Sequence, residues 1–258
     1  MKSIASPCKQ VGYLLMHPDG YYFGSTLATR ADYFAFPRTG SHFLWTALTG
    51  LFDLVFFPNE HVENPEARQR SEELNPLATY AMKLREEGVP FQPVYINASA
   101  QGLHGGPVMG MHPLIILIRH PHPTIYSWYH TATERWGAQI DDVRTWMREA
   151  YAQYATFYDQ AMELQRSHPG KVHLIRFEDL KDDVSELKRI VAFLGVRPKL
   201  SPEFVFEWTR FDRMTRPGPR SFYRVGDNAY WSNDSAWKEH LQAIAPESFS
   251  RFGYPESV

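Results

Sequence analysis

The chain has one cysteine, Cys8, in 258 residues. This scarcity excludes an internal disulfide framework and a thiolate metal cluster, and it fits a reducing compartment. No apolar run is long enough to span a bilayer, and the first residues lack the apolar core of a signal peptide. The formal net charge is only −2, so the charge gives no indication of nucleic acid or of an anionic membrane as partner. We therefore expect a cytoplasmic protein.

The chain also has no internal repeat and no low-complexity tract. Its composition, 43% hydrophobic and 22% charged, is that of an ordinary globular protein. We find no convincing domain boundary, although the pattern becomes irregular from about Pro198. We expect a single domain over residues 1–258.

Short apolar segments alternate with segments of helical periodicity. A Pro-Asp-Gly turn within 11–30 predicts a hairpin or strand pair ahead of them. The expected strands are 33–36, 91–96, 114–118 and 172–177, and the expected helices are 43–52, 77–88, 125–132, 143–164 and 187–194. This alternation predicts an α/β fold with a parallel sheet and ligands at the carboxyl ends of its strands.

The first candidate site is the turn Pro37-Arg38-Thr39-Gly40-Ser41, which joins an aromatic strand to the first helix. The N–H groups and dipole of a helix N-terminus favour an anion there. Gly40 permits a close backbone approach, Thr39 and Ser41 add hydroxyl donors, and Arg38 adds a fixed charge. The turn is not the nucleoside-triphosphatase P-loop, because G-x-x-x-x-G-K-[ST] is absent. An ordinary capped turn is the alternative.

Two further stretches carry basic residues. Arg119 follows the apolar strand 114–118, and Ser127 lies eight positions later in the first turns of the next helix. Together they would form a second anion site at a helix N-terminus. A structural ion pair for Arg119 and a capping role for Ser127 are the alternative. The third stretch, Phe222–Asp227 with Trp231 beyond it, is a weak signal that also fits a surface turn.

Taken together, these stretches resemble the PAPS-dependent sulfotransferases, which use 3′-phosphoadenosine 5′-phosphosulfate as donor. The family's 5′-phosphosulfate loop, roughly Y-P-K-S-G-T-T-W, is similar to Phe36–Phe43, with arginine for lysine as in some branches. Its strand ending in arginine, with a serine eight residues on, resembles Arg119 and Ser127. Its Y-E-D-L resembles Phe177–Leu180, and its R-K-G…W resembles Arg224-Val225-Gly226…Trp231. The resemblance covers roughly residues 32–231.

The resemblance implies a three-layer, P-loop-like fold and a donor site whose product is adenosine 3′,5′-bisphosphate. It places Arg38 at the bridging and leaving oxygens, and it implies the following donor-binding residues: Arg38, Thr39, Gly40, Ser41, His42, Phe43, Arg119, Ser127, Phe177, Arg224, Val225 and Gly226. It implies no metal and a small-molecule acceptor with a hydroxyl or amine. The dimerisation signature of the cytosolic animal members is absent, so the oligomeric state stays open.

Four positions depart from the family pattern. His42 replaces a hydroxyl residue, Phe43 the tryptophan that stacks on adenine, Phe177 a tyrosine, and Val225 a cation. For the general base the resemblance points to His104, since an ordinary histidine pKa of about 6.5 suits that role. A solvated loop histidine is the alternative reading of His104, and His112 is the fallback base.

Two other function classes stay open at this point. A kinase or nucleoside triphosphatase of the same fold would normally need the P-loop lysine and magnesium. A nucleotide-binding module without catalysis would bind adenosine 3′,5′-bisphosphate and transfer nothing. Several histidines, among them His112, His120, His122 and His130, suggest a metal site only weakly, because H-E-x-x-H is absent.

Overall fold

The computed structural model describes residues 29–58, 93–98, 107, 109–110, 112–210, 230–244 and 252–254. In chain order the strands are β1 (Thr29–Ala35), β2 (Asp53–Pro58), β3 (Pro93–Ala98), β4 (Leu114–Ile118) and β5 (Val172–Arg176). The helices are α2 (Ser41–Leu51), α5 (Pro121–His130), the π-helix η2 (Thr131–Arg135), α6 (Val143–Ser167), α7 (Phe177–Asp182), α8 (Val184–Leu194), α9 (Pro202–Trp208), the 3₁₀ helix η3 (Tyr230–Asn233) and α11 (Ser235–Ile244).

The strands form one parallel sheet in the order β2-β3-β1-β4-β5. β1 therefore lies in the middle, beside β4, with Ala35 opposite Leu117. The turns that leave these two strands consequently emerge side by side. At such a point an open parallel sheet offers a crevice for a ligand.

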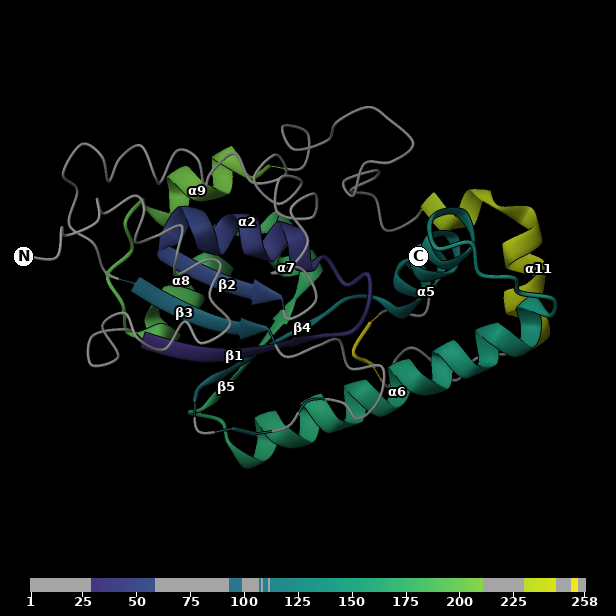
Figure 1. Cartoon of the computed structure of the whole chain (residues 1–258), viewed down its shortest axis with the longest axis horizontal. Coiled ribbons are helices and arrows are strands. Elements are labelled where there is room, and N and C mark those ends of the chain that lie inside the picture. The colour runs from purple at the N-terminus through teal and green to yellow at the C-terminus, as the bar shows by residue number, and fades with distance from the viewer. Residues whose placement is uncertain are drawn as a thin grey trace, which may run out of the picture.

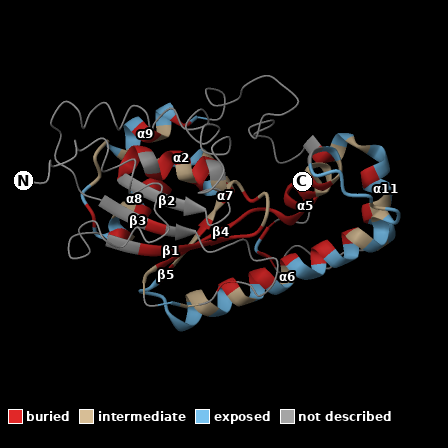
Figure 2. Cartoon of the chain, in the orientation of Figure 1, coloured by how far each residue is buried: buried red, intermediate tan, exposed pale blue. Residues whose placement is uncertain are grey.

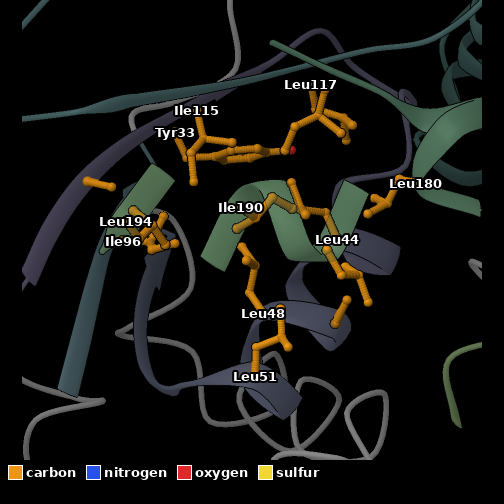
Figure 3. Close-up of a cluster of buried hydrophobic side chains, with 14 of the residues drawn as sticks. Tyr33, Leu44, Leu48, Leu51, Ile96, Ile115, Leu117, Leu180, Ile190 and Leu194 are labelled. Atoms are coloured by element: carbon orange, nitrogen blue, oxygen red, sulfur yellow. The ribbon is translucent and has the colours of Figure 1, made fainter. Parts of the chain in front are cut away.

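Helices cover both faces of the sheet. Figure 1 shows α2, α8 and α9 on one side and the long α6 on the other. Alternate residues of β1 enter the two cores: Tyr33 and Ala35 pack with α2, α7 and α8, whereas Phe34 packs with α5 and α6. Figure 3 shows the first of these cores, with Leu44, Leu48 and Leu51 of α2 facing the sheet. This is the α/β fold with a parallel sheet flanked by helices that the sequence predicted.

Most predicted elements that fall on described residues are confirmed. β4 spans 114–118 as expected, because it is buried on both faces and reads as a continuous apolar run. Asp142 caps α6 by accepting hydrogen bonds from two backbone N–H groups, and buried residues alternate with exposed ones along that helix (Figure 2). Gly195, with φ of 63°, ends α8 in the left-handed conformation.

Other expectations were wrong or lie outside the described residues. β2 was not predicted, because its run of Leu54 to Phe57 follows α2 without a turn signal. Phe177 begins α7 instead of ending β5, and α9 and α11 lie in the stretch expected to be irregular. The expected helix 77–88 and nearly all of the hairpin segment 11–30 lie outside the described residues. The single domain stays a prediction.

Candidate functional site

The turn from β1 to α2 has an unusual backbone. Arg38 has a φ of 69° and Gly40 a φ of 105°, both in the left-handed region. Gly40 suits that region, but an arginine there carries backbone strain, which in proteins clusters at functional sites. Thr39 lies between them, fully buried, and both its N–H and its hydroxyl donate to the carbonyl of Phe36. The Thr39 hydroxyl therefore closes the turn in this structure, and its predicted contact with an anion stays a prediction.

The N-terminus of α2 has no side-chain cap and no acidic residue in its first turn. Its leading N–H groups and the positive end of its dipole are thus left for a ligand. The Ser41 hydroxyl at this end accepts a hydrogen bond of 2.9 Å from the Tyr33 hydroxyl. Since Tyr33 supplies the donor in that bond, the Ser41 proton stays available for an acceptor on a ligand.

Arg38 and Arg119 converge at this end of the sheet. Arg38 Nε donates to Ser127 Oγ at 3.1 Å, which ties the turn to α5. Arg119 Nη1 donates to the backbone carbonyl of Arg38 at 3.4 Å. The sequence predicted Ser127 beside Arg119; the structure instead gives its hydroxyl to Arg38. Residues from three separate segments thereby form one cationic cluster.

The two aromatic residues expected to stack on adenine are both buried. Phe177 lies against Gly40, where an added Cβ would approach its ring to 2.3 Å, and the guanidinium of Arg119 covers the ring at 4.6 Å. Phe43 packs edge-on against Phe177 with 5.8 Å between ring centroids. In this arrangement neither ring presents an open face to a base, so the expected stacking would require these contacts to rearrange.

The N-terminus of α5 differs from that of α2, because its leading backbone N–H groups are not available to an anion; the second anion site at Arg119 and Ser127 stays a prediction. Pro121 and Pro123 have no N–H, His122 N donates to His120 Nδ1 at 3.2 Å, and Thr124 N donates to the His120 carbonyl. Even His120 N is used, since it donates to Glu178 Oε1 at 3.0 Å. Every leading donor of α5 is therefore absent or occupied.

Burial and charge keep the two histidines of this cap neutral. Burial, with the charge of Arg119 as a second cause, lowers the pKa of His120 to about 4. Burial and the neighbouring His120 lower the pKa of His122 to about 3. A neutral His120 ring can accept the hydrogen bond from His122 N, so the low pKa and the cap support each other.

The remaining predicted site residues divide into two groups. His104, Arg224, Val225 and Gly226 lie outside the described residues, as does the side chain of His42. Trp231 and His112 are described: Trp231 packs against His122 with 4.6 Å between ring centroids, and His112 is half-buried just before β4.

Sequence reasoning missed Tyr33, Glu178 and His120 as parts of this site. Tyr33 reads as one aromatic among several in β1. Glu178 sits in the quoted F-E-D-L motif but was given no role, and His120 was considered only as a weak metal ligand. Only His120 had a local signal, since it directly follows Arg119 in the sequence; nothing local placed Tyr33 or Glu178 at the site.

The family model of the sulfotransferase domain matches residues 110–250, which is more than half of the chain. The chain belongs to the sulfotransferase family. This match supports an enzyme that transfers sulfuryl groups, and neither the comparisons nor the described residues of the site favour a kinase.

Solved structures agree on the fold of this sulfotransferase. Mouse sulfotransferase SULT7A1, complexed with PAP, is similar with a TM-score of 0.52 and 14% identity over 86% of this chain and 85% of that one. Retinol dehydratase in complex with androsterone and inactive cofactor PAP is similar with a TM-score of 0.50 and 13% identity, over 85% of this chain and 80% of that one. Comparison with curated protein sequences gives no match.

Two features of the described residues bear on partners. None of their helices combines the length and apolar character that crossing a bilayer requires. Within the same ranges, no three His, Cys, Asp or Glu side chains gather so as to hold a metal ion. Independence from metal stays a prediction, as does the cytoplasmic location.

Proposed function

We propose that this sulfotransferase takes a sulfuryl group from 3′-phosphoadenosine 5′-phosphosulfate and transfers it in line to a hydroxyl or amine of a small-molecule acceptor. The observation that carries the proposal is the convergence of Arg38 and Arg119 at the uncapped N-terminus of α2. Two guanidinium groups and a helix N-terminus suit a ligand with several phosphate or sulfate charges. The PAP complexes of SULT7A1 and retinol dehydratase point to the same donor class.

In this proposal Arg38 acts on the charge that develops during transfer. Sulfuryl transfer resembles phosphoryl transfer in having a loose transition state, so catalysis depends on positioning and on stabilising the leaving phosphate. The Ser127 hydroxyl accepts from Arg38 Nε and so positions the guanidinium, and in the proposal the Nη groups of Arg38 act on the bridging and leaving oxygens. The N–H groups of Gly40, Ser41 and His42 surround the 5′-phosphate.

Arg119 takes the 3′-phosphate in the proposal, together with Ser127 and the Arg224–Gly226 stretch. The charge of Arg119 acts on its neighbours: after burial, it is the second cause of the low pKa of His120. Phe43 and Phe177 serve the adenine, after Arg119 has moved from the Phe177 ring to the phosphate. His104 is the proposed base, with His112 as the fallback.

The acceptor is proposed only as a small molecule. Retinol dehydratase was solved with androsterone, which is such a molecule. A panel of phenols, alcohols, sugars and amines with radiolabelled donor would identify the acceptor class.

Calorimetry tests the donor assignment. We expect metal-independent binding of adenosine 3′,5′-bisphosphate and much weaker binding of ATP, with or without magnesium. A preference for ATP with magnesium would favour the kinase class instead. Binding of the bisphosphate without transfer to any acceptor in the panel would favour a binding module.

A further inference from the structure

The segment Phe252–Tyr254 packs beneath the cationic cluster, although it lies beyond the end of the family match at residue 250. Phe252 and Tyr254 are buried, with 3% and 6% of their surface exposed. The Phe252 ring lies edge-on against Tyr154 and Tyr158 of α6, with centroid distances of 5.5 and 5.0 Å. The segment is therefore packed in the core between α6 and the sheet (Figure 1).

Tyr254 contacts the residues that follow the ends of β4 and β5. Its hydroxyl donates to Glu178 Oε2 at 3.3 Å, and its ring lies 4.9 Å from that of His120. The guanidinium of Arg176 also packs on the Tyr254 ring, at 4.9 Å from its centroid. Its Nη1 donates to the Gly253 carbonyl at 3.0 Å. Burial raises the pKa of Tyr254, so its hydroxyl remains a donor.

Tyr154 and Glu178, which both contact the segment, also hydrogen-bond to one and the same peptide group. Glu178 Oε1 accepts from His120 N at 3.0 Å, and the hydroxyl of Tyr154 donates to the carbonyl of Arg119. The Arg119 carbonyl and the His120 N–H are the two ends of one planar peptide unit. These two hydrogen bonds clamp the peptide from both ends: Phe252 supports the Tyr154 clamp by packing against that ring, and Tyr254 supports the Glu178 clamp through its hydroxyl.

We propose that Phe252–Tyr254 is a positioning element of the donor site: by backing both clamps on the Arg119–His120 peptide, it aims the Arg119 side chain at the donor's phosphate. The proposal rests on the proposed function, since it assigns Arg119 to the donor. Docking of the segment and binding of the donor are then coupled, and the coupling acts equally in both directions.

Gly253 offers a test with a matched control. It has a φ of 65°, and a Cβ there would lie 2.4 Å from Arg176 Nη2. Gly195 has a φ of 63° with no atom within 4 Å of an added Cβ. Gly253→Ala and Gly195→Ala therefore carry a similar backbone penalty, but only the first displaces the Arg176 guanidinium, which donates to the Gly253 carbonyl and covers the Tyr254 ring. Tyr254→Phe removes the hydroxyl bond to Glu178 and keeps the ring, so it serves if Gly253→Ala fails to fold.

Calorimetry with adenosine 3′,5′-bisphosphate and steady-state kinetics measure the effect. We expect the bisphosphate Kd to rise about 10-fold in Gly253→Ala and about 3-fold in Tyr254→Phe. The donor KM should rise in parallel with an unchanged acceptor KM, whereas Gly195→Ala should bind as the wild type does. Bisphosphate should also slow amide exchange at 252–254 in the wild type.

Two results would overturn the inference. Wild-type donor affinity in both Gly253→Ala and Tyr254→Phe would remove the segment from the donor site and leave the proposed function standing. Failure of the wild-type protein to bind the bisphosphate would remove the proposed function and this inference together.

Discussion

The helices α2 and α5 start at the carboxyl ends of neighbouring parallel strands, yet their N-termini are built in opposite ways. α2 begins at a left-handed glycine with no side-chain cap. α5 begins with a histidine cap and two prolines, and its leading donors are absent or occupied. The difference teaches that a helix N-terminus after a parallel strand is not by itself an anion site; the residues that start the helix decide whether its donors are free for a ligand.

We call the N-terminus of α2 the open end and that of α5 the closed end. The closed end helps to position a residue of the open end. Because α5 is fixed at its start by His120 and Glu178, Ser127 is held where its hydroxyl accepts from Arg38. The two ends thus have different roles: the start of α2 offers backbone N–H donors to a ligand, and α5 places Ser127 beside Arg38. Four changes would break or sharpen this comparison.

Replacing Arg38 should have the largest effect. Arg38→Ala removes the cation at the open end, and we expect kcat/KM to fall by about 10²- to 10³-fold, as for loss of a donor to transition-state charge. Arg38→Lys keeps the charge but loses Nε and should recover part of the activity. Arg166→Ala, at an exposed arginine of α6, is the control and should leave kinetics unchanged. Near-normal turnover in Arg38→Ala would exclude the proposed role.

Giving α2 an acidic first residue should make its start resemble a closed one. Ser41→Asp places a carboxylate in the first turn, which stabilises a helix by about 0.3–1 kcal/mol through its dipole. The same charge repels the donor, so we expect bisphosphate affinity to fall by about 10²-fold while the melting temperature holds or rises. Ser41→Ala, with no charge, should weaken binding only a few-fold. Equal binding by the two variants would contradict an anion site at this end.

Acid should weaken the closed end. His120 and His122 are surrounded by Arg119, Glu178, Tyr151 and Tyr254, and their folded pKa values are about 4 and about 3. The unfolded chain, with histidine pKa values near ~6.5, binds protons first as pH falls. Each histidine therefore lowers the unfolding free energy by up to about 1.4 kcal/mol per pH unit between pH ~6.5 and its folded pKa.

Urea unfolding at pH 7.5, 6.0 and 5.0 checks this slope. The variant His122→Gln cannot titrate, so its stability should fall less steeply with acidification than that of the wild type. Identical slopes would mean that His122 is not buried as a neutral ring.

The sequence could predict the open end better than the closed one. The order strand, Arg-Thr-Gly-Ser, helix is a local pattern, and the structure places each of these residues at the end of β1 as expected. The closure of α5 depends on Glu178, which is 58 positions from His120, and on Tyr254, which is 76 positions from Glu178. Such contacts follow from how the sheet brings β4 and β5 together, and no local pattern carries that information.

The burial of Phe177 illustrates the same limit. A motif gives a residue type at a position, but it does not say what covers the ring. Here Gly40 lies against Phe177 because it has no Cβ, and Arg119 covers it because β4 and β5 are neighbours. The role of Phe177 toward adenine accordingly stays a prediction.

The smallest expected effect on donor binding is that of Tyr33, whose hydroxyl donates to Ser41 at the open end. Tyr33→Phe removes the donor to Ser41 Oγ and leaves the buried ring in place. One net hydrogen bond is worth about 0.5–1.5 kcal/mol, so bisphosphate affinity should fall about 2- to 10-fold with little change in kcat. Tyr126→Phe, which removes a 3.1 Å bond from α5 to Asp234, is the matched control and should leave affinity unchanged. If the two variants bind alike, the Ser41 hydroxyl is not oriented through Tyr33, and the open end depends on Arg38 and the α2 backbone alone.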